Sequence, residues 1–171
     1  MLFKLLDEED PELMAVAFDK EAPTFRHQEF EDYKANRKEM PEELRPQINL
    51  VKQVVEALNI PIFEIEGYEA DDVIGTLARE AEAEDMEVYI VTGDRDALQL
   101  VTDKVNVIYT KQGITNIVKY DLETVKKDFE LKPEQLVDKK GLMGDSSDNI
   151  PGVPLIGKKT ATSLLKDFSS L

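Results

Sequence analysis

The sequence predicts an α/β fold, a three-layer arrangement in which helices cover a mainly parallel sheet. Segments of strand length recur along the chain: residues 13–19 and 87–93 are apolar runs, and residues 61–67 alternate between apolar and polar side chains. Hydrophobic residues at helical spacing lie between these segments, at residues 44–58 and from Ala70 onward. Hydrophobic residues make up 42 % of the chain, enough to form a core. Strands that alternate with helices favour parallel pairing, because each helix carries the chain back to the start of the next strand.

In the first half of the chain, predicted helices and strands precede and follow a basic segment. Its first six residues carry an apolar pattern that indicates the end of an amphipathic helix. The run 13–19 predicts a buried strand that ends in Asp19. Residues 20–40 are polar and carry most of the positive charge of this half. We expect Pro41 to open the helix that follows, because proline is favoured at the first helical position.

The second half continues the alternation of strands and helices. The buried strand 87–93 precedes a short helix through Leu98 and Leu100. A pair of strands with Gly113 at the turn comes next. In order, the elements predicted after residue 104 are the strands 105–110 and 114–120 and the helices 121–129 and 133–143.

The chain changes character near residue 144. Glycines and prolines there mark a turn, and a helix begins near Lys158. We therefore expect residues 1–143 to form the α/β core. Residues 144–171 are expected to form the start of a helix–hairpin–helix segment.

Composition excludes several kinds of site. The chain has no cysteine, so a disulfide framework and a cysteine-based zinc site are impossible, and one histidine leaves little room for a histidine-rich site. The net charge of −15, taken alone, disfavours nucleic-acid binding. Acidic residues follow the short apolar start at once, so neither a signal peptide nor a membrane span is predicted. We expect a cytoplasmic protein.

Acidic residues gather where the predicted strands end. Ligands of an open parallel sheet bind beyond the carboxyl ends of its strands, and four acidic groups follow strands or precede the hairpin. These groups are Asp19; Glu69, Asp71 and Asp72; Asp94 and Asp96; and Asp145 and Asp148. So many carboxylates at one edge would repel one another unless a cation neutralised them. Oxygen ligands suit Mg²⁺ or Mn²⁺, so we predict a site for such ions.

Ordinary structural roles remain open for each of these acids. Asp71, Asp72 or Asp96 could cap the helix that it precedes or begins. Asp145 and Asp148 could be turn residues.

The chemistry that such a site would support is phosphodiester hydrolysis. Two-metal sites hold ions about 3.5 to 4 Å apart, one activating water and one stabilising the leaving oxygen. Lys34 and Arg37, one helical turn apart, could contact a phosphate, although a solvated helix face is the alternative.

Four segments in order then identify a family resemblance. They read AFDKEAPTFRHQEFEDYKANR, YEADDVIGTLA, VTGDRDALQLV and GLMGDSSDNIPGV. They resemble the 5′–3′ exonuclease domain of bacterial DNA polymerases I, within the PIN-like flap endonuclease family, and the likeness runs through essentially the whole chain. The resemblance implies a magnesium-dependent enzyme of the bacterial cytoplasm, a monomer. It would cut DNA at 5′ ends and 5′ flaps during primer removal and repair, leaving 5′-phosphates.

The resemblance also implies roles for individual residues. Asp19, Glu69, Asp71 and Asp72 would hold the first metal group, and Asp94, Asp96, Asp145 and Asp148 the second. Arg26, Lys34 and Arg37 would contact the region of the scissile phosphate. The hairpin would bind duplex backbone, with a monovalent cation, through Gly152, Val153, Gly157, Lys158, Lys159 and Thr160. Such contacts recognise the shape of DNA rather than its sequence.

Three departures from the family pattern are expected to matter. The family begins with a central strand that carries a further metal-binding Asp in a segment like LIDGN, and no such segment precedes Met1. The hairpin normally reads GVPGIG, whereas Leu155 stands here for the first Gly of its GIG turn, a place where positive φ would disfavour leucine. The chain also stops at Leu171, before the family's remaining helices. We therefore expect a domain truncated at both ends.

Three other functions stay open at this point. A PIN-type ribonuclease would share the fold and the acidic edge, but the hairpin segment argues against it. A DNA-binding remnant would bind flaps without cutting them. A phosphatase of the haloacid dehalogenase type would use the spacing of Asp94 and Asp96, but the other motifs do not follow its pattern.

Overall fold

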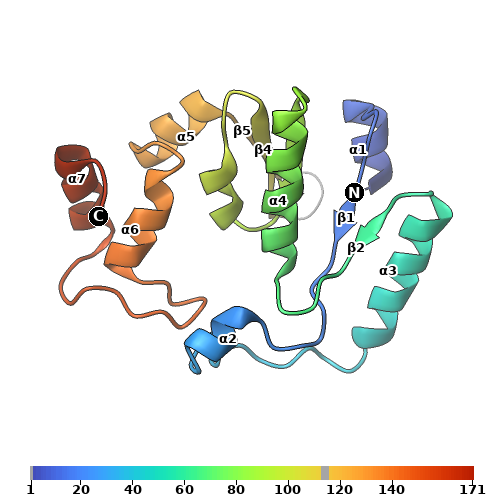
Figure 1. Cartoon of the computed structure of the whole chain (residues 1–171), viewed down its shortest axis with the longest axis horizontal. Helices are drawn as coiled ribbons and strands as arrows, with labels where there is room; N and C mark the ends of the chain where they lie inside the picture. The colour runs from blue at the N-terminus through green and yellow to red at the C-terminus, as the bar shows by residue number, and fades with distance from the viewer. Residues whose placement is uncertain (1, 113–115) are drawn as a thin grey trace.

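The computed structural model describes residues 2–112 and 116–171 and confirms the predicted α/β class (Figure 1). The helix α4 (Ala70–Ala83) stands in the middle of the view, between two groups of strands. On one side lies a three-stranded sheet in the order β3–β4–β5, and on the other a two-stranded sheet, β1–β2. Two of the three strand pairings in the described residues are parallel, in agreement with a mainly parallel arrangement.

The three-stranded sheet forms where the sequence predicts it. The strand β3 (Val88–Thr92) pairs in parallel with β4 (Val105–Gln112), and β4 pairs antiparallel with β5 (Asn116–Tyr120). Their apolar side chains meet α4 and the 3₁₀ helix η1 (Asp96–Leu100) in one core. Leu98, Val105 and Val107 in this core are fully buried. The turn predicted at Gly113 lies outside the described residues.

The two-stranded sheet is smaller than predicted. The strand β1 covers Val16–Ala17 and β2 covers Ile62–Phe63, whereas the sequence predicts strands over the segments 13–19 and 61–67. A strand extends only as far as a neighbour supplies hydrogen-bond partners, and in the described part of the chain β1 and β2 pair only with each other. Both segments include exposed residues that lie outside the paired strands. Leu13 precedes β1, and Ile65 follows β2.

Helices flank the small sheet. One of them begins the chain, and another follows the basic segment. The helix α1 (Leu2–Glu9) is present where the first residues predict it, and α2 (Phe25–Glu29) is a short helix within the basic segment. The helix α3 (Arg45–Ala57) contacts β2. The prediction that Pro41 opens this helix is wrong. Pro46 takes the first-turn position instead, because residues 42–44 form a turn before the helix.

The C-terminal helices pack around a second, smaller core. The helices α5 (Leu122–Phe129) and α6 (Gln135–Met143) follow β5, and α7 (Lys158–Phe168) packs against α6. Leu131, Leu142, Ala161 and Leu165 form this core. The loop between α6 and α7 returns toward α2, so the C-terminal segment borders the basic segment (Figure 1). Within the described ranges, no helix combines the length and the apolar character needed to cross a membrane.

Candidate metal centre

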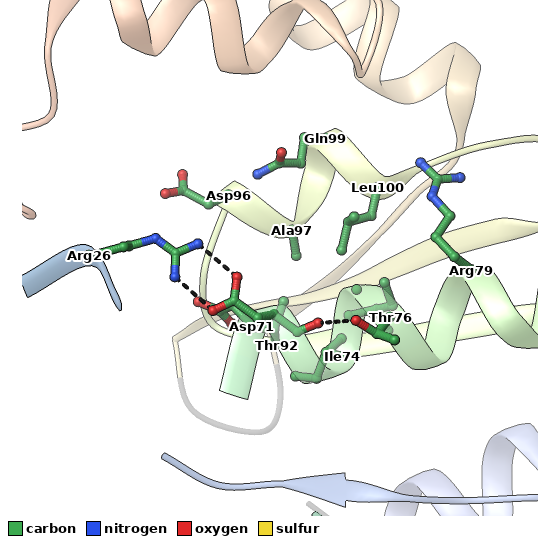
Figure 2. Close-up of a pocket in the computed structure, with 13 residues that line it drawn as sticks. Arg26, Asp71, Ile74, Thr76, Arg79, Thr92, Asp96, Ala97, Gln99 and Leu100 are labelled. Carbon is green, nitrogen blue, oxygen red and sulfur yellow. Dashed lines mark hydrogen bonds and ion pairs between the residues drawn. The ribbon is translucent and has the colours of Figure 1, made fainter. Parts of the chain in front are cut away.

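Four places in the fold bring carboxylates to one edge of the molecule. Asp19 follows β1, and the acids of residues 69–72 begin α4. Asp94 and Asp96 follow β3, and the loop after α6 supplies the last pair. Figure 2 shows Asp71 on α4 and Asp96 on η1 facing the same space, into which Arg26 extends from α2. The strand-end rule therefore predicted this gathering from residues far apart in the sequence.

Asp96, Asp145 and Asp148 form the tightest carboxylate group among the described residues. One carboxylate oxygen from each lies within 4.8 Å of the others. Asp145 Oδ1 accepts hydrogen bonds from the backbone N–H of Ser147 at 2.9 Å and from its hydroxyl at 2.5 Å. This is the local turn contact that the alternative interpretation predicted, and it leaves Asp145 Oδ2 for other partners.

The N-terminus of α4 organises another part of the edge. Asp19 Oδ1 accepts a hydrogen bond from the backbone N–H of Ala70 at 2.7 Å. The backbone N–H of Glu69 donates to Asp72 Oδ2 at 3.0 Å, so Asp72 does serve as a helix-capping residue. Acids at this end are favoured because the helix dipole is positive there. Capping is not the only role of Asp72, because the same carboxylate also binds Arg26.

Arg26 and Asp72 form a two-pronged ion pair. Arg26 Nη1 and Nη2 each donate to one oxygen of Asp72 at 2.7 Å, and Glu69 lies 3.8 Å from Nη1. This geometry is the strong form of an arginine–carboxylate contact. The hydrogen bonds from Arg26 hold the pKa of Asp72 below its usual value, although burial acts in the opposite direction.

The remaining residues of the basic segment bind the same acidic edge. Lys34 Nζ lies 2.6 Å from Glu69 Oε1, and Arg37 Nη2 lies 2.7 Å from Asp148 Oδ1. Tyr33 joins these two pairs, because its hydroxyl donates to Glu69 at 3.1 Å and to Asp148 at 3.3 Å. Burial, followed by the charges of these two acids, raises the pKa of Tyr33 well above its ordinary value. The phenol therefore stays a hydrogen-bond donor.

Asp71 has no basic partner of this kind in the described chain. Desolvation raises the pKa of Asp71 to about 6, and the nearby charges of Asp94, Asp19 and Glu69 add to the effect. Its side chain keeps an exposed surface, but the surrounding protein and acids disfavour its ionised form. Uncompensated negative charge is therefore concentrated on the side of the edge where Asp19, Asp71 and Asp94 lie.

A lysine from α6 lies inside the acidic group. Lys140 Nζ contacts Asp96 Oδ2 and Asp145 Oδ2, each at 2.5 Å. Burial raises the pKa of Asp96, and the hydrogen bond from Lys140 opposes that rise without cancelling it. Burial also acts upward on Asp145, yet hydrogen bonds from Lys140 and Ser147 outweigh it and hold the pKa of Asp145 at about 2. The surroundings therefore favour the ionised form of Asp145 and disfavour that of Asp96.

A cavity of about 510 Å³ opens beside these groups. Asp71, Asp72, Asp96 and Arg26 line its charged part, while Ile74, Ile90 and Leu100 are among its apolar lining residues (Figure 2). The acidic edge is therefore reachable from outside, and a ligand bound there would touch both polar and apolar surface.

Hydrogen bonds to backbone carbonyls hold the loop after α6 against the basic segment. Asn36 Nδ2 donates to the carbonyl of Ser146 at 2.7 Å, and Asn149 Nδ2 donates to the carbonyl of Asp32 at 2.8 Å. The backbone N–H of Lys34 donates to the carbonyl of Asp148 at 2.9 Å. These contacts set the distance between the basic residues and the carboxylates of the loop.

The hairpin residues fall into two groups. Gly152 lies against α6, since a Cβ on it would come 2.2 Å from the carbonyl carbon of Met143. Close packing against α6 therefore requires a glycine at position 152. A Cβ on Gly157 would meet nothing within 4 Å, and Lys158, Lys159 and Thr160 form the exposed first turn of α7.

Two further hairpin residues face solvent. Val153 is half exposed. Leu155 has φ +68° and a fully exposed side chain. The positive φ suspected from the sequence at this position is therefore present.

Sequence reasoning missed two residues of the site as individual participants. Tyr33 lies in the segment 20–40, which the sequence distinguishes only by its polar character and positive charge, and Lys140 is one position of the predicted helix 133–143. No local pattern distinguishes Lys140 from its neighbour Lys139, which instead lies over the ring of Phe129.

The donor set fits a hard divalent cation. The clustered ligand atoms of Asp96, Asp145 and Asp148 are all carboxylate oxygens, which suit Mg²⁺ or Mn²⁺. The predicted ligands Asp19, Glu69, Asp71, Asp72 and Asp94 lie at the same edge but are not part of that tight group. Their assignment as ligands, like the phosphate-contacting roles of Arg26, Lys34 and Arg37, stays a prediction.

Two family models together match the whole chain. The 5′-3′ exonuclease N-terminal resolvase-like domain matches residues 1–130, and the 5′-3′ exonuclease C-terminal SAM fold matches residues 131–171. The boundary predicted between residues 143 and 144 stays a prediction. DNA polymerase I of Bacillus caldotenax is 53 % identical over all of this chain and 20 % of its own length. The chain spans about a fifth of the length of the curated relatives it matches.

Solved structures show the same likeness. The bacteriophage T5 D15 protein, co-crystallised with metal ions, superposes with a TM-score of 0.84 at 27 % identity, covering 99 % of this chain and 66 % of that one. A flap endonuclease variant of the same phage protein, in a complex with DNA and metal ions, has a TM-score of 0.82 at 27 % identity, covering 99 % and 65 %.

Proposed function

The chain belongs to the 5′-3′ exonuclease family, and we propose that it is the nuclease core of a DNA-processing enzyme. It would hydrolyse phosphodiesters at 5′ ends and 5′ flaps of DNA, as the polymerase I-type domain does in primer removal and repair. The relatives extend far beyond this chain, so activity of the isolated chain is part of the proposal.

The observation that carries the proposal is the group formed by Asp96, Asp145 and Asp148. It brings three carboxylate oxygens within 4.8 Å of one another next to an open cavity and three basic side chains. Carboxylates next to cations suit a substrate that is itself an anion bound through divalent metal ions. Solved relatives of this fold were crystallised with metal ions and with DNA, which supports the same interpretation.

Each part of the site would have a separate task. Two or more Mg²⁺ or Mn²⁺ ions, when bound, would supply a nucleophilic hydroxide and stabilise the leaving oxygen. Arg26, Lys34 and Arg37 would contact the phosphate that is cut. In the structure all three are paired with acids, so substrate would have to exchange these partners. Tyr33, which stays protonated, would hold Glu69 and Asp148 in position.

The hairpin would hold the duplex away from the cut. The exposed first turn of α7 presents Lys158, Lys159 and Thr160, together with backbone N–H groups that have no partner within the helix. Open space around Gly157 allows close approach of a phosphate, with a monovalent cation at the turn. Local contacts of this kind would let a chain of net charge −15 bind DNA. We further propose that the protein acts as a monomer in the bacterial cytoplasm.

A labelled 5′-flap duplex tests the proposal. The chain should release the flap with Mg²⁺ and leave it uncut in EDTA. Asp94→Asn should cut more than about 100-fold more slowly, since even outer groups around a metal are worth 10- to 100-fold. Asp103→Asn removes the same charge at an exposed residue outside the site and should cut normally.

Several outcomes would count against the nuclease assignment. Cleavage without metal, or equal cleavage by Asp94→Asn, would contradict the metal-dependent reaction. Faster cleavage of single-stranded RNA than of the flap would favour a PIN-type ribonuclease. Tight flap binding without cleavage would favour a non-catalytic DNA-binding protein.

A further inference from the structure

Among residues 2–112 and 116–171, Lys140 is the basic residue that contacts the carboxylates of the acidic edge from outside the basic segment. It projects from α6 and bridges two carboxylates of different elements, Asp96 at the start of η1 and Asp145 in the loop. Its Nζ contacts both oxygens of Asp96 and lies 2.5 Å from Asp145 Oδ2. The ammonium group of Lys140 therefore already occupies the position between these two carboxylates.

A divalent ion shared by the same two carboxylates would need nearly the same position. Mg²⁺ binds carboxylate oxygens at about 2.0 to 2.1 Å. An ion and an ammonium group cannot both lie that close to Asp96 Oδ2 and Asp145 Oδ2 without overlapping. Metal binding at this pair therefore requires that the Lys140 side chain leave.

The structure also indicates that Lys140 can leave. Its side chain is 40 % exposed, whereas that of Asp145 is 11 % exposed. Lysine holds a compact ammonium group on a flexible four-carbon stem, unlike the planar guanidinium of Arg26, which forms a bidentate pair with Asp72. The ammonium can therefore move to solvent, or to an anion bound nearby, while the carboxylates stay in place.

The rest of the edge differs in this respect. In the described part of the chain, Asp19, Asp71 and Asp94 make no ion pair with a basic side chain. A divalent ion that binds among these three has no resident cation to displace. The two halves of the edge should therefore bind divalent ions with different affinities.

We propose that Lys140 is an internal cation that holds Asp96 and Asp145 together in the metal-free protein and competes with the divalent ion for this pair. Lys140 is thus a positioning residue that weakens metal binding at one half of the site. The inference rests on the proposed metal centre, and it adds that occupancy of the Asp96–Asp145 half is set by exchange with a side chain.

Binding of Mn²⁺, followed by electron paramagnetic resonance of the free ion, tests this role without DNA or turnover. Lys140→Met should bind Mn²⁺ on the order of tenfold more tightly at the weaker site, within the range usual for coupled binding. Lys140→Arg keeps the charge and should bind close to wild type. Lys126→Met makes the same charge change on α5, at an exposed residue away from the edge, and should leave the affinity unchanged.

A second measurement uses the unaltered chain, so it does not depend on the folding of a variant. The side-chain NH₃⁺ signal of Lys140 in ¹⁵N spectra should report an ion-paired lysine without metal. Titration with diamagnetic Mg²⁺ should shift it to the signal of a mobile lysine, whereas the signal of Lys126 should not change.

The outcomes separate this inference from the proposed function. Unchanged or weaker Mn²⁺ binding by Lys140→Met, with a clear loss in Asp145→Asn, would contradict the role of Lys140 alone. A Lys140 signal that saturating Mg²⁺ leaves unaltered would contradict it as well. Failure of every form, wild type included, to bind Mn²⁺ would overturn the metal centre itself and Lys140's role with it.

Discussion

Removal of the charge of Asp71 should stabilise the metal-free protein, although it removes a proposed ligand. Asp71 lies among Asp94, Asp19 and Glu69 and lines the cavity beside α4. Desolvation together with these charges raises the pKa of Asp71 from 3.8 to about 6. The ionised carboxylate is therefore less stable in the folded chain than in the unfolded chain.

The size of the effect follows from this difference. A rise of the pKa of Asp71 from 3.8 to about 6 corresponds to roughly 3 kcal/mol. The side chain is exposed, so solvent screens much of that energy, and the favourable dipole of α4 is lost with the charge. We therefore expect Asp71→Asn to gain about 1 kcal/mol at pH 8, or about 2 to 4 °C in Tm for a chain of this size.

The sign of the pH dependence makes the prediction specific. Between pH 3.8 and about 6 the folded chain holds the Asp71 proton more tightly than the unfolded chain does, so wild-type stability falls as pH rises through this window. At pH 5 the folded carboxyl is mostly protonated while the unfolded one is mostly ionised, so about half of the gain from Asp71→Asn should be lost relative to pH 8.

Urea unfolding in EDTA at pH 5 and pH 8 measures both quantities. Asp103→Asn, at an exposed residue outside the edge, serves as the control and should show no such difference between the two pH values. Added Mg²⁺ should stabilise wild type more than Asp71→Asn, because only the wild-type site keeps all its carboxylates. A variant that is less stable than wild type at pH 8 in EDTA would refute the reasoning.

Two predictions concern the hairpin. Leu155→Gly should raise the urea midpoint by the equivalent of about 0.5 to 1 kcal/mol. The left-handed backbone costs an L-residue about 1 to 2 kcal/mol, and the greater entropy of glycine in the unfolded chain offsets part of the stability gained by relieving this cost. A lowered midpoint would show that Leu155 makes stabilising contacts. Gly152→Ala should lose about 1 to 3 kcal/mol, because its Cβ would lie 2.2 Å from the carbonyl carbon of Met143. The matched change Gly157→Ala meets open space, so equal losses in thermal unfolding of the two variants would contradict the packing argument.

The sequence by itself determined the order of elements and the place of the acidic edge. Alternating apolar runs and helical spacing are local properties, and they predicted β3, α4 and α7 close to their observed bounds. The strand-end rule then brought Asp19, Asp71 and Asp96 to one edge, because parallel strands share the side on which they end.

Only the tertiary structure decided what each side chain does at that edge. The lengths of β1 and β2 depend on the neighbours that supply hydrogen bonds, and apolar runs carry no such information. Asp72 proved to be both a helix cap and the partner of Arg26, 46 residues away. The difference between Lys140 and Lys139 arises because a rotation of about 100° along α6 directs one toward Asp96 and the other toward Phe129. Contacts between residues far apart in the chain set these roles, so local patterns could not predict them.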